Sequence, residues 1–186
     1  MSFRGTSLLS LPATFMPVTV SLAIGAGLAL PAYAAELKID VEIPKINVAE
    51  YHRPYVAVWI EGADQSVAAN LSVWYQQRAN SEGHGTKWLP DLRQWWRRSG
   101  RTLKVPVDGV TGPTRPVGRH ALSFKDSDPR LAGLAPGQYT LVVEAAREVG
   151  GRELLKIPFT WKPKAAFSGS AKGTTELGAI SLKIVP

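Results

Sequence analysis

The sequence contains no cysteine. Disulfide bonds, c-type haem attachment, thiolate metal sites and cysteine nucleophiles are therefore excluded together. The three histidines, His52, His84 and His120, lack the short spacing of a zinc site, so we expect no metal centre. Neither a Gly-x-Ser-x-Gly elbow nor a glycine-rich phosphate loop opening a helix is present. Because these motifs are absent, we expect no catalytic residues. A carrier or binding module is favoured over an enzyme.

Acidic residues are absent from residues 1–34, which have the composition of an export signal. One basic residue, Arg4, precedes an apolar run over 8–30, and Ala32-Tyr33-Ala34 offers the small residues that a signal peptidase needs. We expect cleavage after the second of these alanines, which leaves a domain over 35–186; a membrane anchor is the alternative interpretation. A twin-arginine pair is missing, so export in the unfolded state to the periplasm is expected, and any cofactor would be added there.

Basic residues outnumber acidic ones by 22 to 15, and the formal net charge is +7 at pH 7. A basic surface would suit an anionic partner. Nucleic acid is not an expected partner of an exported protein. Once the signal peptide is removed, we expect no stable insertion into the membrane.

Short apolar segments with a period of two predict an all-β fold, an immunoglobulin-like antiparallel β-sandwich with one short inserted helix. Residues 55–60 are apolar on both faces, which predicts a central strand covered on both sides. Gly150-Gly151 marks a hairpin, and Pro158 marks an edge strand or a bulge. Residues 164–175 are small and polar, and we expect them to form a loop. The expected strands are 37–43, 55–60, 71–75, 119–124, 138–147, 153–161 and 180–184.

The inserted helix is expected over 90–99, because a proline precedes it and two arginines lie in its last turn. Leu92, Trp95 and Trp96 share one face, and a helix this short must pack that face on another element. Two roles are open for this segment. Its indoles close the open end of the sandwich, or they bind an anionic or sugar ligand together with the arginines of the helix.

The segment 108–116 reads Asp-Gly-Val-Thr-Gly-Pro-Thr-Arg-Pro. It holds two hydroxyl groups, one carboxylate and one guanidinium close together in sequence. Its glycines and prolines exclude a helix or a central strand and predict a loop. The first seven residues resemble the acceptor motif of periplasmic FMN transferases, Asp-Gly-x-Ser/Thr-Gly-Ala-Thr, whose last threonine is esterified by the flavin phosphate. Six of the seven positions match, and Pro113 stands where alanine is usual.

This resemblance implies FMN attached covalently to Thr114. Threonine is a poor nucleophile, so the transferase and its metal would activate the hydroxyl and cleave FAD. The glycines would let the loop enter the transferase, Asp108 and Thr111 would fix its shape, and Arg115 would offset the phosphate charge. Tryptophans of the helical segment, or Trp88, would stack on the flavin. The implied cofactor residues are Thr114, Asp108, Gly109, Thr111, Gly112, Arg115, Trp95 and Trp96. The alternative is an ordinary connecting loop with Thr114 at its surface.

Several blocks also resemble a family of predicted periplasmic proteins, domain of unknown function number 2271. The blocks are 51–59, 87–96, 108–116, 136–139 and 144–148. The resemblance extends over nearly all of the chain after residue 36 and implies an exported β-rich domain that works beside membrane-bound redox proteins. Together the two resemblances predict a periplasmic electron carrier, with an FMN transferase and a membrane redox protein as partners. The alternative is a cofactor-free binding or interaction module that uses a basic, Trp-rich surface.

Overall fold

The computed structural model describes residues 1–2, 35–79, 81 and 83–186. The signal peptide predicted for residues 1–34 lies outside the described residues, apart from the first two. Within the described part of the chain, no helix has the length and hydrophobicity needed to span a membrane.

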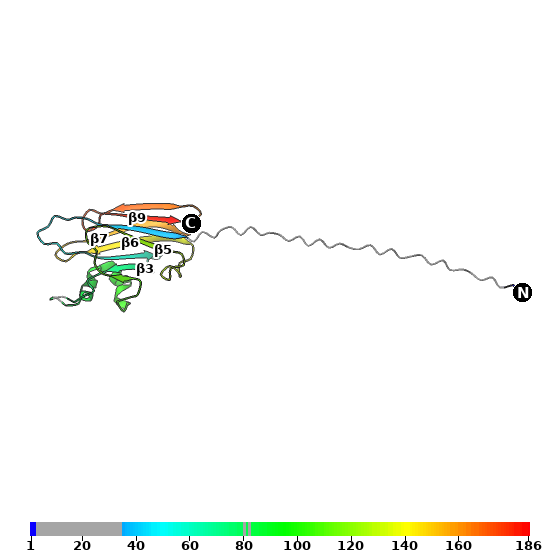
Figure 1. Cartoon of the computed structure of the whole chain (residues 1–186), viewed down its shortest axis with the longest axis horizontal. Coiled ribbons are helices and arrows are strands. Elements are labelled where there is room, and N and C mark those ends of the chain that lie inside the picture. The colour runs from blue at the N-terminus through cyan, green and yellow to red at the C-terminus, as the bar shows by residue number, and fades with distance from the viewer. Residues whose placement is uncertain (3–34, 80, 82) are drawn as a thin grey trace. The chain divides into compact units, whose positions relative to one another are not determined.

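Two β-sheets pack face to face in the folded domain (Figure 1). The first has the order β5-β1-β9-β8 and the second the order β4-β3-β2-β6-β7. The predicted all-β sandwich is confirmed. The strands are β1 (Glu36–Ile43), β2 (Tyr55–Glu61), β3 (Val67–Trp74), β4 (Thr111–Gly112), β5 (Gly118–Lys125), β6 (Gly137–Ala146), β7 (Arg152–Trp161), β8 (Phe167–Lys172) and β9 (Ala179–Val185).

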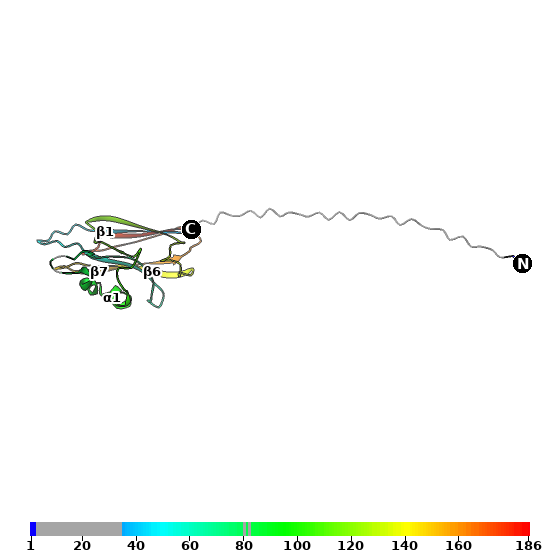
Figure 2. The same cartoon turned by 60° about the horizontal axis from the view of Figure 1, so that its bottom comes forward.

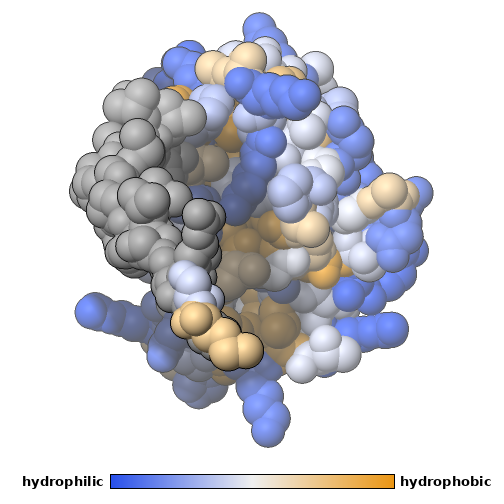
Figure 3. Space-filling model, turned by 90° about the vertical axis from the view of Figure 1, so that its right-hand side faces the viewer, coloured by the Kyte–Doolittle hydropathy of each residue, from blue (hydrophilic) through white to orange (hydrophobic). Residues whose placement is uncertain are grey.

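The core between the sheets follows from the period-two pattern of the outer strands. In β1, Leu37, Ile39 and Val41 are buried in this core, whereas the intervening Lys38 is exposed. A strand places alternate side chains on opposite faces, so one face of the first sheet is apolar and the other polar. Figure 3 shows one end of the domain, where hydrophilic side chains project around the rim.

The second sheet is buried on both faces along β2, as the sequence predicts. Val56, Val58 and Ile60 belong to the core between the sheets, and Ala57 and Trp59 belong to a second core on the outer face. Three short helical elements cover this outer face (Figure 2): η1 (Gly85–Asp91), α1 (Arg93–Arg98) and η2 (Gly100–Thr102). The domain therefore has a third, helical layer.

The tryptophan helix differs from its prediction in extent and position. Pro90 lies inside η1, and the α-helix begins only at Arg93, because Leu92 has φ −74° and ψ 69°, outside the helical region. Trp95 is fully buried in the second core, so the indoles cover the outer face of a sheet and do not close the open end of the sandwich.

Two segments predicted as loops contain strands. Residues 164–175 include β8, which pairs antiparallel with β9 at the edge of the first sheet. The segment 108–116 includes the two residues of β4, which pair parallel with β3. In β8, Phe167 and Ala171 pack against the core and alternate with exposed polar residues, but Gly169 between them leaves the apolar pattern weak. β4 has no apolar pattern and depends on backbone hydrogen bonds to β3 and its flanks. The predicted hairpin of β6 and β7 is confirmed, as is the edge position of the strand that contains Pro158.

A buried carboxylate joins the helical layer to the second sheet. Glu144 on β6 is fully buried and accepts hydrogen bonds from the backbone N–H groups of Gln94 (3.0 Å) and Trp95 (2.8 Å). Arg152 Nη1 on β7 donates a third bond to it at 2.8 Å. The first N–H groups of a helix have no acceptor within the helix, so Glu144 supplies from the sheet what a local capping residue would supply.

We predict that Glu144→Ala lowers the free energy of unfolding by about 3 to 5 kcal/mol, because it leaves helical N–H groups and Arg152 without their buried acceptor. Glu144→Gln keeps one acceptor oxygen and should cost less. Urea denaturation of the two variants measures the difference. Wild-type stability in Glu144→Ala would contradict the capping role.

A second carboxylate, Glu153 on β7, holds the segment before β9. It accepts hydrogen bonds from four consecutive backbone N–H groups, at 2.7 to 3.0 Å, over residues 174–177. Burial by itself raises the pKa of Glu153, but the backbone hydrogen bonds, which favour the ionised form, outweigh it and lower the pKa below its ordinary value.

This lowered pKa predicts a stability that depends on pH. Because the folded-state pKa lies below the unfolded value, Glu153 stabilises the fold above the unfolded pKa, and this contribution is lost as the pH falls through the folded pKa. Glu153→Gln should therefore have a lower free energy of unfolding than wild type at neutral pH. The difference between the two proteins should become smaller as the pH falls. Urea denaturation at a series of pH values tests this; a gap independent of pH would contradict it.

Candidate functional site

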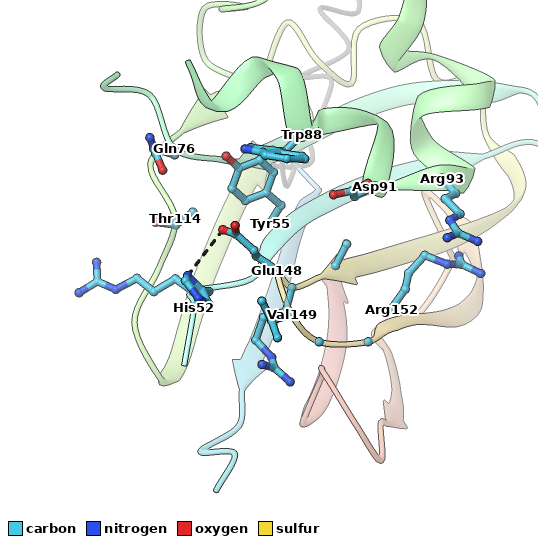
Figure 4. Close-up of a pocket in the computed structure, with 15 residues that line it drawn as sticks. His52, Tyr55, Gln76, Trp88, Asp91, Arg93, Thr114, Glu148, Val149 and Arg152 are labelled. Carbon is cyan, nitrogen blue, oxygen red and sulfur yellow. Dashed lines mark ion pairs between the residues drawn. The ribbon is translucent and has the colours of Figure 1, made fainter. Parts of the chain in front are cut away.

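A cavity of about 540 Å³ opens beside the β6–β7 hairpin (Figure 4). Its walls come from the segment leading into β2, from η1 and the start of α1, from the turn of the hairpin, and from the segment after β4. Small-molecule sites in proteins have volumes of about 300 to 1,000 Å³. The cavity is therefore large enough for a cofactor-sized ligand.

Thr114 lines this cavity. Its side chain is half-buried, and its hydroxyl forms no hydrogen bond with any residue in the described part of the chain. The preceding residues are held against β3, because Val73 donates to the carbonyl of Val110 (2.8 Å) and Tyr75 to that of Gly112 (3.0 Å). Thr114 therefore follows an anchored segment but keeps its own hydroxyl free.

Side-chain contacts also fix the start of the segment. The Thr111 hydroxyl donates to the carbonyl of Val107 (3.0 Å) and accepts from its N–H (3.1 Å). Arg130 donates to the carbonyl of Gly109, whose φ of +71° suits glycine. Asp128 holds this guanidinium at 2.6 Å, and the hydrogen bonds of Arg130 lower the pKa of Asp128. The shape of the segment is thus set before a partner binds.

Two aromatic side chains form a wall of the cavity. Trp88 of η1 is 41% exposed, and Tyr55, at the start of β2, lies next to it (Figure 4). The Tyr55 hydroxyl donates to the carbonyl of Gly85 at 3.2 Å, and burial raises the pKa of Tyr55. Lys87 Nζ lies over the Trp88 ring, 4.7 Å from its centroid. A planar ligand can stack on this aromatic surface where Lys87 leaves it open.

The charged groups of the lining are predominantly basic: four arginines line the cavity together with two carboxylates. Two of the arginines are already neutralised. Arg147 pairs with the buried Glu176 at 2.8 Å, and Arg152 pairs with Glu144. The other two are Arg53 and Arg93, and the carboxylates are Asp91 and Glu148. No group of three His, Asp or Glu side chains placed to hold a metal occurs among the residues that the structure describes.

Some of the residues predicted for the cofactor site lie elsewhere. Trp95 is fully buried, and its indole N–H donates to Asn70 at 2.8 Å. Trp96 packs against the second core, and neither indole lines the cavity. The guanidinium of Arg115 lies over the ring of Trp74, 5.5 Å from its centroid, and does not line the cavity either. The structure therefore brings together Thr114 and Trp88, and it leaves these three residues outside.

The other residues of the motif lie in β4 and on either side of it. Asp108 and Gly109 are exposed at the turn before β4, and Thr111 and Gly112 form β4 itself. Pro113 is exposed and does not bury the threonine that follows it. Arg93 belongs to the helix whose arginines are candidates for anion binding, but Tyr55 and the hairpin turn have no local sequence signal. These residues come together only through the packing of η1 and α1 on the sheet.

Together, the fold and the cavity define a β-sandwich domain with a basic, aromatic-walled site at the end of its second sheet. The chain belongs to DUF2271, a family described as a predicted periplasmic protein, which matches residues 36–179. A search of curated proteins found no match, and a search of solved structures found none either. The family description agrees with the export that the sequence predicts, and it assigns no activity.

We predict that the two tryptophans differ sharply in their effect on folding. Trp95→Ala should lower the free energy of unfolding by about 3 to 5 kcal/mol, since it empties a buried site. Trp88→Ala, at the exposed cavity wall, should cost about 1 kcal/mol or less. Urea denaturation of both variants tests this assignment. Equal losses would mean that Trp88 serves the core and not the cavity.

Proposed function

We propose that this domain is an exported electron carrier with FMN attached covalently to Thr114. The observation that supports this most is the position of Thr114: the last residue of a segment resembling a flavin-acceptor motif lines a cofactor-sized cavity with its hydroxyl free. A threonine without a hydrogen-bond partner can enter the active site of a modifying enzyme without breaking a contact of the fold.

The lining fits FMN in two respects. Trp88 and Tyr55 offer a flat aromatic surface for an isoalloxazine ring. Arg53 lines the cavity as well and can donate to a phosphodiester on Thr114. His52 is held by Glu50 and Glu148, and Arg115 lies over Trp74, so this role belongs to Arg53. Bound FMN supplies the redox chemistry, and the domain holds the ring and limits its contact with water.

Attachment requires a partner, because threonine is a poor nucleophile and the Thr114 hydroxyl has no hydrogen bond to a base among the described residues. In the loading reaction, Thr114 Oγ1 forms a bond to the FMN phosphorus of FAD, the P–O–P bridge breaks, and AMP leaves. The threonine proton passes to a base of the transferase, whose metal activates the reactants. Asp108 and Gly109 are exposed at the anchored turn, so that enzyme could contact them directly.

We predict that the mature protein, co-produced with a periplasmic FMN transferase and FAD, gains the mass of one FMN less one water. Thr114→Val has a side chain of the same shape without the hydroxyl and should show no gain. Thr114→Ser keeps a hydroxyl and should be modified. Intact-protein mass spectrometry and flavin fluorescence that survives denaturation provide the measurement.

A positive control is needed, in which the same transferase modifies an acceptor domain that it is known to load. An unmodified, colourless wild-type protein alongside that modified control would contradict the proposal. It would favour the cofactor-free binding module instead. Modification that persists in Thr114→Val would assign the flavin to another residue.

A further inference from the structure

The cavity has two distinct ends (Figure 4). Thr114 lies at one end, Arg93 and Arg152 lie at the other, and Trp88 and Tyr55 lie between them. A flavin attached to Thr114 through its phosphate and stacked on the aromatic wall would direct its ring toward the arginine end. The charges at that end would then act on the part of the cofactor that accepts electrons.

The charges at this end are not equivalent. Arg152 donates to the fully buried Glu144, so its positive charge is offset inside the protein. Arg93 is exposed and forms neither a hydrogen bond nor an ion pair with any described residue. Asp91, two residues before it, lines the same cavity and also has no ion pair within the described part of the chain. Among the described residues, Arg93 and Asp91 are therefore a cation and an anion without ion-pair partners beside the wall, in addition to Lys87, whose Nζ lies over the Trp88 ring.

One of these charges already affects the pKa of an aromatic residue of the cavity wall. Burial is the main reason that the pKa of Tyr55 is raised, and the negative charges of Glu148 and Asp91 raise it further. The carboxylate of Asp91 thus acts on a ring of the cavity wall. A flavin stacked on that wall would experience the same field.

We propose that Arg93 raises the reduction potential of a flavin in this cavity and that Asp91 lowers it; this inference rests on the proposed attachment of FMN to Thr114. Reduction transfers two electrons to the ring from an external reductant, which is oxidised, and one proton from solvent. The ring therefore gains one negative charge. A cation beside it favours the reduced form, and an anion opposes it.

The test is a spectroelectrochemical titration of the flavinylated protein with dithionite as the reductant. Arg93→Gln should reduce the equilibrium constant for reduction about tenfold, which lowers the midpoint potential by about 30 mV for a two-electron couple. Arg93→Lys keeps the charge and should stay near the wild-type potential. Asp91→Asn should shift the potential in the opposite direction, toward more positive values.

Lys183→Gln is the matched control, because Lys183 is an exposed cation on β9 in the other sheet. Its potential should equal that of the wild type. If Arg93→Gln shifts the potential no further than Lys183→Gln does, the inference is overturned while the attachment to Thr114 stands. If the wild-type protein takes up no flavin beside an active transferase control, the proposed function fails and this inference fails with it.

Discussion

The hydrogen bonds that Glu144 accepts are the interaction on which the rest of the site depends. They join the first N–H groups of α1 to the second sheet, and the same carboxylate fixes Arg152 on the hairpin. Trp88 and Arg93 come from the helical layer held in this way, and they face the hairpin across the cavity. Because α1 has no side-chain cap of its own, a sheet residue holds the helical wall of the cavity in place.

The strands of the core could be predicted from the sequence because buried strand positions require apolar residues in a regular pattern. Alternation of Leu37, Ile39 and Val41 with polar residues is sufficient to place β1, and the double-sided apolar pattern of β2 indicates cover on both faces. The same reasoning misses β8, where Phe167 and Ala171 alternate with polar residues but Gly169 between them leaves the apolar pattern weak. Antiparallel pairing with β9 completes that strand.

The residues of the site also differ in how well the sequence predicts them. Thr114 could be identified because its motif is contiguous. Closeness to that motif in sequence favours Trp95 and Trp96 over Trp88, although only Trp88 lines the cavity. Tyr55, Arg93 and the hairpin turn come from separate segments, so no local pattern connects them. Trp95 illustrates the limit: helical spacing indicates that its face must be covered, but it does not show which surface covers it. A stacking role and a core role therefore have the same sequence pattern.

Pro158 has a consequence for the exposed edge of the second sheet. The edge of a sheet can pair with any strand that approaches it. Pro158 lies in β7, at the edge of the sheet that bears the cavity, and proline has no N–H to offer such a strand. Lys156 adds an exposed charge on the same strand. A second chain would therefore find a missing donor at Pro158 when it approached this edge.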